Sequence, residues 1–281
     1  MQLVDRGLTT SECVVRGRQA EMLAAMRRYR QNREKYIRDS LLTKIPVGDT
    51  VLRESVSYFI ERPGKLYRPL LVLLSCEIVG GKYQDAIGAA CAVELVHSSS
   101  LILDDLPCMD HAERRRGRLA LHKRFGDAIA ILSAIYLLNK AYESVADIRH
   151  GSLRVLEMLS ESIGERGMVT GQVMDLTRHH KTRKMQQLKT GALISASVRI
   201  GAYLGAAKVS QEQALLTYAE RVGAAFQLRD DFMDSDSNGD AQREAIRLAG
   251  EAARKILRDF ECTKAAFALA GMALYAAQRI V

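Results

Sequence analysis

The distribution of proline limits the possible folds of this chain more than any other feature of its sequence. There are four prolines, at positions 46, 63, 69 and 107, and none between residues 108 and 281. This long stretch is rich in Ala, Leu, Met, Gln, Glu, Lys and Arg, which are strong helix formers. No segment alternates apolar and polar residues for long enough to demand a strand. The sequence therefore predicts an all-α protein.

Glycines, prolines and polar turns divide the helical pattern into separate segments. Residues 1–17 are predicted to be a flexible N-terminal tail. Residues 18–281 contain no repeat or linker, so we expect them to form a single all-α domain, a helical bundle. The predicted helices cover residues 18–42, 50–61, 69–79, 85–106, 122–147, 152–176, 184–206, 211–234 and 241–261, with a short helix at the C-terminus.

Composition argues against several classes of protein. The formal net charge of +8 suits an anionic partner, but no nucleic-acid-binding motif accompanies it and Trp is absent. The five cysteines are odd in number and widely spaced, which favours reduced thiols over disulfides or a zinc site. The N-terminus lacks the apolar core of a signal peptide, and no uncharged apolar run reaches the ~18 residues of a membrane span. We therefore expect a cytoplasmic protein without a membrane span or a nucleic-acid partner.

An unusual cluster of charges occupies residues 99–117, SSLILDDLPCMDHAERRRG. Asp104 and Asp105 follow an apolar helix, where the helix dipole is negative. Two carboxylates ~5 Å apart repel by roughly 3 kcal/mol at an effective dielectric constant of about 20. Asp110 can fold back toward them, and hard oxygen ligands of this kind suit Mg²⁺ that is shared with a substrate phosphate. The alternative is a solvated helix end whose counter-charges are supplied by residues 114–116.

A second acidic cluster lies in residues 226–234, FQLRDDFMD. Asp230 and Asp234 are spaced i,i+4 and share one helix face, with Asp231 beside them and Gln227 one turn earlier. Two aspartate-rich helix ends far apart in sequence can face each other across a helical bundle. Such a pocket would hold several divalent cations and an anionic guest, and a diphosphate fits because it needs metals and cationic side chains together.

Short motifs occur in a specific order over residues 50–235: GKLYRP (64–69), CEIVGG (76–81), AACAVELVHSSSLILDDLPCMD (89–110), RRG (115–117), HKRFG (122–126), GQVMDL (171–176), KTGAL (189–193) and FQLRDDFMD (226–234). In this order the chain resembles the trans-prenyl diphosphate synthases, especially the short-chain geranylgeranyl diphosphate synthases. The resemblance implies an all-α bundle around a deep central apolar cavity, with a homodimer as the usual assembly.

The resemblance also implies that the aspartates of both clusters form a magnesium site for about three ions, bound together with a diphosphate. Asp104 and Asp110 would be ligands of the first cluster, with Asp105 supporting them. In the second cluster Asp230 would be the main ligand, while Asp231 and Asp234 would hold metal-bound water.

The implied substrates are isopentenyl diphosphate and an allylic prenyl diphosphate. Residues that would bind isopentenyl diphosphate are Lys65, Arg68, His97 and Arg116. Residues that would bind the allylic diphosphate are Arg115 and Lys189. The backbone of Lys189 and Thr190 and the side chain of Gln227 would face the carbocation that forms when the allylic C–O bond breaks. The implied reaction is ionisation, condensation and elimination.

Product length is expected to depend on Ser99 and Ser100, which precede the first acidic cluster by about one helical turn. In the family a bulky aromatic residue there stops the chain at farnesyl diphosphate. Serine leaves room for another isoprene unit, and the long DDLPCMD spelling resembles enzymes that stop at geranylgeranyl diphosphate. The sequence therefore predicts geranylgeranyl diphosphate as the product.

Several departures from the family pattern leave alternatives open. Leu66 replaces a basic residue, Leu103 replaces a common histidine, and the pair 134–135 replaces a common Gly-Asp. A lysine-bearing loop normally follows the second acidic cluster, but here DSDSNGD (234–240) passes directly into AQREAIRLAGEA (241–252), so either the protein lacks this loop or this sequence omits it. The alternatives are a terpene cyclase on the same scaffold, which needs no isopentenyl site, and a non-catalytic subunit that tunes an active homologue. The retained basic residues argue against the first, and the complete acidic clusters argue against the second.

Overall fold

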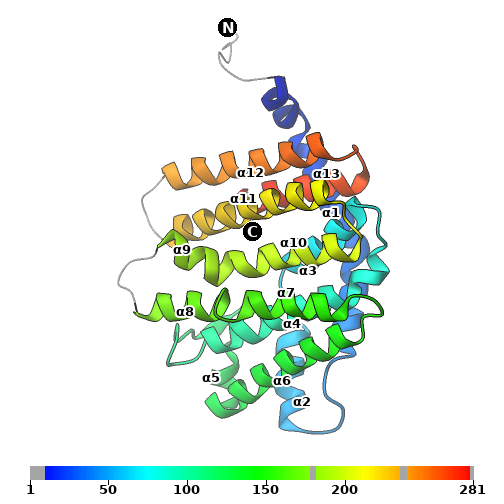
Figure 1. Cartoon of the computed structure of the whole chain (residues 1–281). Helices are drawn as coiled ribbons and strands as arrows, with labels where there is room; N and C mark the ends of the chain where they lie inside the picture. Colours follow the sequence, from blue (N-terminus) through cyan, green and yellow to red (C-terminus); the bar gives the residue numbers. More distant parts are fainter. Residues whose placement is uncertain (1–9, 178–181, 235–238, 279–281) are drawn as a thin grey trace.

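The computed structural model describes residues 10–177, 182–234 and 239–278, and it confirms the predicted all-α class (Figure 1). The helices, including one π-helix (η1), are α1 (Thr10–Leu42), α2 (Val51–Ile60), α3 (Tyr67–Ile78), α4 (Tyr83–Asp104), α5 (Leu121–Phe125), α6 (Asp127–Ala146), α7 (Ser152–Ile163), α8 (Met168–Thr177), α9 (Arg183–Gln186), η1 (Gln187–Gly191), α10 (Ala192–Leu204), α11 (Val209–Asp234), α12 (Gly239–Asp259) and α13 (Lys264–Gln278). A small antiparallel hairpin, β1 (Arg114–Arg115) and β2 (Arg118–Leu119), lies between α4 and α5.

Helix α4 is the centre of the bundle. It packs against α3, α6, α10 and α1, and most of its residues from Ala86 to Ile102 are buried. Among the described residues α4 is also the one helix long and apolar enough to cross a membrane, with a mean hydropathy of 1.6 over its best window. Since 67% of that window is buried inside the protein, α4 has the character of a core helix.

The C-terminal half of the chain forms a stack beside α4. Helices α10, α11 and α12 run side by side in Figure 1, and each packs against the next. Helix α13 lies against α1, α3, α11 and α12. This packing brings the last helix of the described chain next to the start of α3, and the functional cavity lies there.

Three predicted helices are interrupted in the structure. The segment 122–147 breaks at Gly126, and the segment 184–206 contains a π-helical turn between α9 and α10. The segment 152–176 divides into α7 and α8, because the chain turns tightly at Gly167. A Cβ atom at Gly167 would lie 1.8 Å from the carbonyl oxygen of Ser162, so no other residue fits this turn.

The N-terminal boundary also differs from the prediction. Helix α1 begins at Thr10, so residues 10–17 belong to a helix and not to a tail. Residues 1–9 lie outside the described residues. No proline occurs in residues 10–18, so nothing in this segment forces a helix break at residue 18, although its Val and Gly residues are weak helix formers.

Candidate functional site

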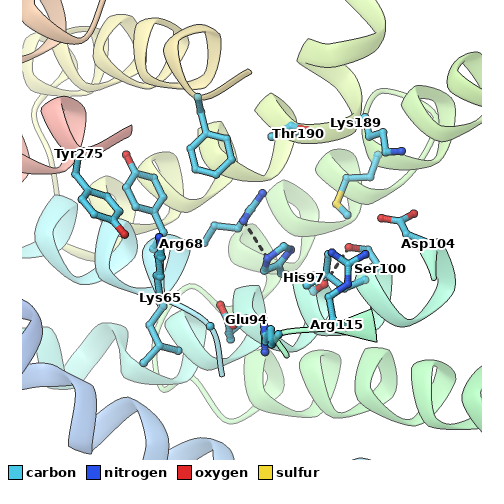
Figure 2. Close-up of a pocket in the computed structure, with 17 residues that line it drawn as sticks. Lys65, Arg68, Glu94, His97, Ser100, Asp104, Arg115, Lys189, Thr190 and Tyr275 are labelled. Carbon is cyan, nitrogen blue, oxygen red and sulfur yellow. Dashed lines mark hydrogen bonds and ion pairs between the residues drawn. The ribbon is translucent and has the colours of Figure 1, made fainter. Parts of the chain in front are cut away.

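Residues from distant parts of the chain line one cavity of about 510 Å³ (Figure 2). They come from the start of α3, one face of α4, the β1–β2 turn, η1, α11 and α13. The predicted site residues that line it are Lys65, Arg68, His97, Ser100, Asp104, Arg115, Arg116, Lys189 and Thr190. The structure therefore brings together the residues predicted for both substrates, although their individual roles stay predictions.

One face of α4 supplies the residues along the length of the cavity. Glu94, His97, Leu101 and Asp104 line it and are spaced by three or four residues, so they share one side of the helix. A rise of about 1.5 Å per residue separates Glu94 from Asp104 by roughly 15 Å. The cavity therefore has two chemically different ends, one near Glu94 and one near Asp104.

The end near Glu94 is dominated by cationic side chains. Arg68 is 8% exposed, and its Nη1 lies 3.2 Å from His97 Nε2 (Figure 2). Arg116 donates from Nη1 to the carbonyl oxygen of Arg62 at 2.7 Å, and its guanidinium group lies over the ring of Phe59. These contacts fix both guanidinium groups beside the cavity, as expected for residues that bind a diphosphate.

The other end combines acids with a lysine. The Asp110 backbone N–H donates to the Asp104 carbonyl oxygen at 2.8 Å, so the chain folds back as the sequence predicted. Burial raises the pKa of the Asp104 carboxyl to about 6; Lys189 opposes this shift, while Asp110 adds to it. A carboxylate with a raised pKa that faces a cavity is typical of a functional site.

Asp105 has a different role from Asp104. Its side chain is fully buried, does not line the cavity, and accepts hydrogen bonds from Arg115, with Nε at 2.9 Å from Oδ1 and 3.1 Å from Oδ2. This pair raises the pKa of Arg115. The Asp105 carboxylate is therefore paired with Arg115 and set back from the cavity, whereas its part in metal binding stays a prediction.

Lys189 and Thr190 lie in the π-helical turn η1, a distortion that is often found at functional sites. The Lys189 Nζ lies 2.6 Å from Asp175 Oδ2 on α8. Helix α8 approaches this turn closely at Gly171, where a Cβ atom would lie 2.2 Å from the Lys189 backbone nitrogen. The glycine of the GQVMDL motif is thus explained by the packing of α8 against η1.

A second, mainly apolar cavity of about 310 Å³ adjoins the first. Ser100, Asp104, Met168 and Lys189 line both. The second cavity continues along α8, past side chains such as Leu103, Leu138, Ile163, Val169, Val173 and Leu176. The predicted deep apolar space is therefore connected to the acidic end of the first cavity.

Ser99 and Ser100 differ in orientation. Both line the apolar cavity, but the Ser99 hydroxyl donates to the Ala134 carbonyl oxygen of α6 at 2.8 Å and its side chain is buried. The Ser100 hydroxyl donates to the His97 carbonyl oxygen at 3.0 Å, and Ser100 lies where the two cavities join. Of the two serines, Ser100 is therefore the one that lines both cavities.

The second acidic cluster occupies the last turns of α11. Asp230, Asp231 and Asp234 belong to this helix, but their side chains fall outside the described residues. Among the described residues, no three His, Cys, Asp or Glu side chains converge as a metal site. Phe226 lines the cavity, whereas Gln227 is not among its lining residues.

The connection after α11 is short. Helix α11 ends at Asp234 and α12 begins at Gly239, so residues 235–238 alone join them. Residues 235–238 contain no lysine, so the lysine-bearing loop of the family does not occur in this stretch of the sequence. On the described side of the cavity, the cations beside Asp104 are Lys189 and Arg115.

The lining or supporting residues that were not predicted include Glu94, Tyr275 and Asp175. A glutamate inside the apolar run AACAVELVH was a signal for Glu94, because acids are rarely buried without partners. Asp175 lies in the GQVMDL motif that carried the resemblance. Nothing in the sequence near Tyr275 indicated that α13 would reach the cavity, where its ring lies 5.5 Å from Lys65 Nζ.

A comparison with known protein families shows which family this chain matches. Residues 49–245 match the model of the polyprenyl synthetases. The chain belongs to the polyprenyl synthetase family. This family comprises prenyltransferases that use isopentenyl and allylic diphosphates, in agreement with a cavity that pairs cationic side chains with an apolar extension.

Relatives within the polyprenyl synthetase family differ in product. The large subunit 2 of a heterodimeric geranylgeranyl pyrophosphate synthase from Arabidopsis thaliana is 36% identical over 225 residues, which cover 75% of this chain and 60% of the relative. A farnesyl diphosphate synthase from Micrococcus luteus is 34% identical over 245 residues, or 79% and 84% of the two chains. The solved geranylgeranyl pyrophosphate synthetase from Pyrococcus horikoshii superposes with a TM-score of 0.82 at 27% identity, covering 93% and 99%.

Proposed function

We propose that this protein condenses isopentenyl diphosphate with an allylic prenyl diphosphate, head to tail, and releases geranylgeranyl diphosphate. The observation that carries the proposal is the junction of the two cavities. A space lined by cations and Asp104 opens at Ser100 and Lys189 into an apolar space. A prenyl diphosphate has the same division, with a charged head and an apolar tail.

Each end of the larger cavity receives one substrate. Lys65, Arg68, His97 and Arg116 bind the diphosphate of isopentenyl diphosphate. Lys189 and Arg115 bind the allylic diphosphate, whose tail extends into the apolar cavity. The two reacting carbons then meet near Lys189 and Thr190, and this fixed approach lowers the entropic part of the barrier.

The chain's own groups assist the reaction by electrostatics. The Thr190 and Lys189 backbone oxygens face the allylic carbon as positive charge develops there, while the cations hold the departing diphosphate. The apolar walls exclude water, which would otherwise capture the cation. The released diphosphate takes the proton that is lost when the new double bond forms.

Magnesium fits the acidic end of the cavity. Asp104 faces the cavity and Asp110 lies close enough to raise the pKa of Asp104, so these two carboxylates offer the oxygen donors that Mg²⁺ prefers. Asp230 of α11 is the third proposed ligand, with Asp231 and Asp234 binding metal-bound water. When bound, Mg²⁺ supplies charge neutralisation to the allylic diphosphate.

A homodimer is the proposed assembly, and the cytoplasm is the proposed compartment. An exposed apolar surface on α6 supports the proposal of a homodimer. This surface is formed by Ile131, Leu132 and Ile135, which are 39%, 55% and 57% exposed. These residues share the side of α6 that faces away from α4. Exposed apolar side chains grouped in this way are typical of interfaces.

Incubation of the purified protein with Mg²⁺, isopentenyl diphosphate and each allylic primer tests the proposal. We expect geranylgeranyl diphosphate to accumulate only when both substrates and the metal are present. Formation of a hydrocarbon from geranylgeranyl diphosphate alone would identify a cyclase instead. A wild-type protein that turns over neither set of substrates, but changes the product of an active homologue, would identify a non-catalytic subunit.

A further inference from the structure

Glu94 is a carboxylate at the end of the cavity that the proposed function assigns to a diphosphate. It lies on α4, is 2% exposed, and lines the larger cavity (Figure 2). An acid repels a diphosphate, and Glu94 is too far along α4 from Asp104 to share the same metal ions, at roughly 15 Å. Its position therefore requires another explanation.

The cations around Glu94 provide that explanation. The Arg116 Nη2 lies 3.9 Å from Glu94 Oε1, and this contact reaches α4 from the β1–β2 turn. Arg68 of α3 is close enough to lower the pKa of the Glu94 carboxyl, as Arg116 does, although burial has the larger, opposite effect. His97, one turn further along α4, contacts Arg68. Glu94 is thus enclosed by the side chains that bind isopentenyl diphosphate in the proposed function.

We propose that Glu94 is a positioning residue for the isopentenyl diphosphate site, and that its carboxylate holds the guanidinium groups of Arg68 and Arg116 toward the cavity before the substrate binds. The inference rests on the proposed function. Without Glu94, the two guanidinium groups in this partly desolvated space would repel each other, and only their contacts with His97, the Arg62 carbonyl oxygen and Phe59 would oppose that repulsion. With Glu94, their orientation is fixed in advance, so less conformational entropy is lost when the diphosphate arrives.

A purely electrostatic role predicts the opposite effect on binding. If Glu94 only added negative charge, then its removal would strengthen the attraction of the cavity for isopentenyl diphosphate and lower the KM. If Glu94 positions the arginines, its removal raises the KM for isopentenyl diphosphate and leaves the KM for the allylic substrate unchanged, since that substrate binds at the Asp104 end. The direction of the change therefore distinguishes the two roles.

The test is Glu94→Gln, which keeps the shape of the side chain and removes its charge. We expect the KM for isopentenyl diphosphate to rise about tenfold, because Arg68 and Arg116 lose the carboxylate that orients them. The matched control is Glu77→Gln on α3, which removes a carboxylate bound to Arg33 at 3.1 Å and outside both cavities. The control should leave the ratio of the two KM values unchanged.

A wild-type ratio of KM values in a folded Glu94→Gln protein, or a lower KM for isopentenyl diphosphate, would overturn the inference. If Glu94→Gln does not fold, Glu94→Asp retracts the carboxylate by one methylene and should raise the same KM alone; no such rise also overturns the inference. Inactivity of the wild-type protein on both substrates would instead refute the proposed function, so the two failures are distinguishable.

Discussion

The two ends of the larger cavity differ in how their buried carboxylates are compensated by neighbouring charges. At the Glu94 end, the protein supplies both signs of charge, since Glu94 lies among Arg68 and Arg116. At the Asp104 end, the pKa of Asp104 is raised to about 6 by burial, with Asp110 adding to the shift and Lys189 only partly opposing it. In the proposed function, the first end is organised before a ligand binds, whereas the second becomes balanced only when cations and an anion arrive together.

The largest effect is expected at the end that depends on an external cation. Replacing Asp104 by Ala removes a proposed metal ligand that no neighbour can replace, so turnover should fall by at least about a thousandfold, or roughly 4 kcal/mol in the barrier. Asp147→Ala, which changes an exposed aspartate on the surface, is the control. Steady-state turnover at saturating substrates and Mg²⁺ is the measurement. Wild-type turnover in Asp104→Ala would contradict the proposed metal site.

At the organised end, a buried acid should reduce stability in a manner that depends on pH. Burial raises the pKa of Glu94 from 4.5 to about 7, so the folded state binds more protons than the unfolded state between these values. Stability should therefore fall as the pH rises from about 4.5 through 7, by up to about 3 kcal/mol. Glu94→Gln should remove this contribution and gain stability relative to wild type at pH 8 but not at pH 4.

Urea unfolding of wild type and Glu94→Gln at both pH values measures this difference. Glu77→Gln is again a suitable control, because Glu77 lies outside the cavity. If the stability difference between Glu94→Gln and wild type were the same at pH 4 and pH 8, the carboxyl of Glu94 would not have a raised pKa. If Glu94→Gln instead gains stability at pH 8 and also raises the KM for isopentenyl diphosphate, then stability is given up for substrate binding at this end.

The adjacent arginines Arg115 and Arg116 should separate the two ends kinetically. Arg116→Ala should raise the KM for isopentenyl diphosphate, and Arg115→Ala the KM for the allylic substrate, each by about ten- to hundredfold. Arg115→Ala should also lower the melting temperature, because it leaves the buried Asp105 without its partner. Arg114→Ala, which changes the exposed neighbour, is the control. Equal effects of both variants on both KM values would remove the distinction between the ends.

The sequence predicted the helices and the residues that meet in the cavity, because both depend on local patterns. Proline and helix formers determine the class, and the order of short motifs identifies Lys65, His97 and Lys189. It could not predict that Asp105 is bound by Arg115, since nothing in the spacing of these residues distinguishes Asp105 from Asp104. The orientation of each carboxylate is decided by the turn that follows α4 and by the β1–β2 hairpin, which are features of tertiary structure.

Helix interruptions were missed for a similar reason. A glycine within a helical pattern is tolerated in many helices, so Gly126 and Gly167 did not demand a break. The requirement at Gly167 comes from the carbonyl oxygen of Ser162, and that at Gly171 from the backbone of Lys189. These approaches exist only in the folded chain. The second acidic cluster at Asp230 stays a prediction.

The smallest effect on turnover is expected in the apolar cavity beyond both charged ends. Ser99→Phe places a ring next to Ala134, where the Ser99 hydroxyl now donates a hydrogen bond, and the ring must enter the cavity of about 310 Å³ because the interior around α6 is closely packed. The ring then occupies space that the end of the prenyl tail would fill. The product should shift toward farnesyl diphosphate, with turnover reduced by no more than about tenfold, since the charged ends are untouched.

Ser100→Phe is the informative comparison: Ser100 lies at the junction of the two cavities, so a ring there should hinder entry of the allylic tail and raise the KM for the allylic substrate. Chromatography of the dephosphorylated products gives the chain lengths. An active Ser99→Phe protein that still makes geranylgeranyl diphosphate would place the limit on chain length deeper in the cavity, at side chains such as Leu138 or Ile163.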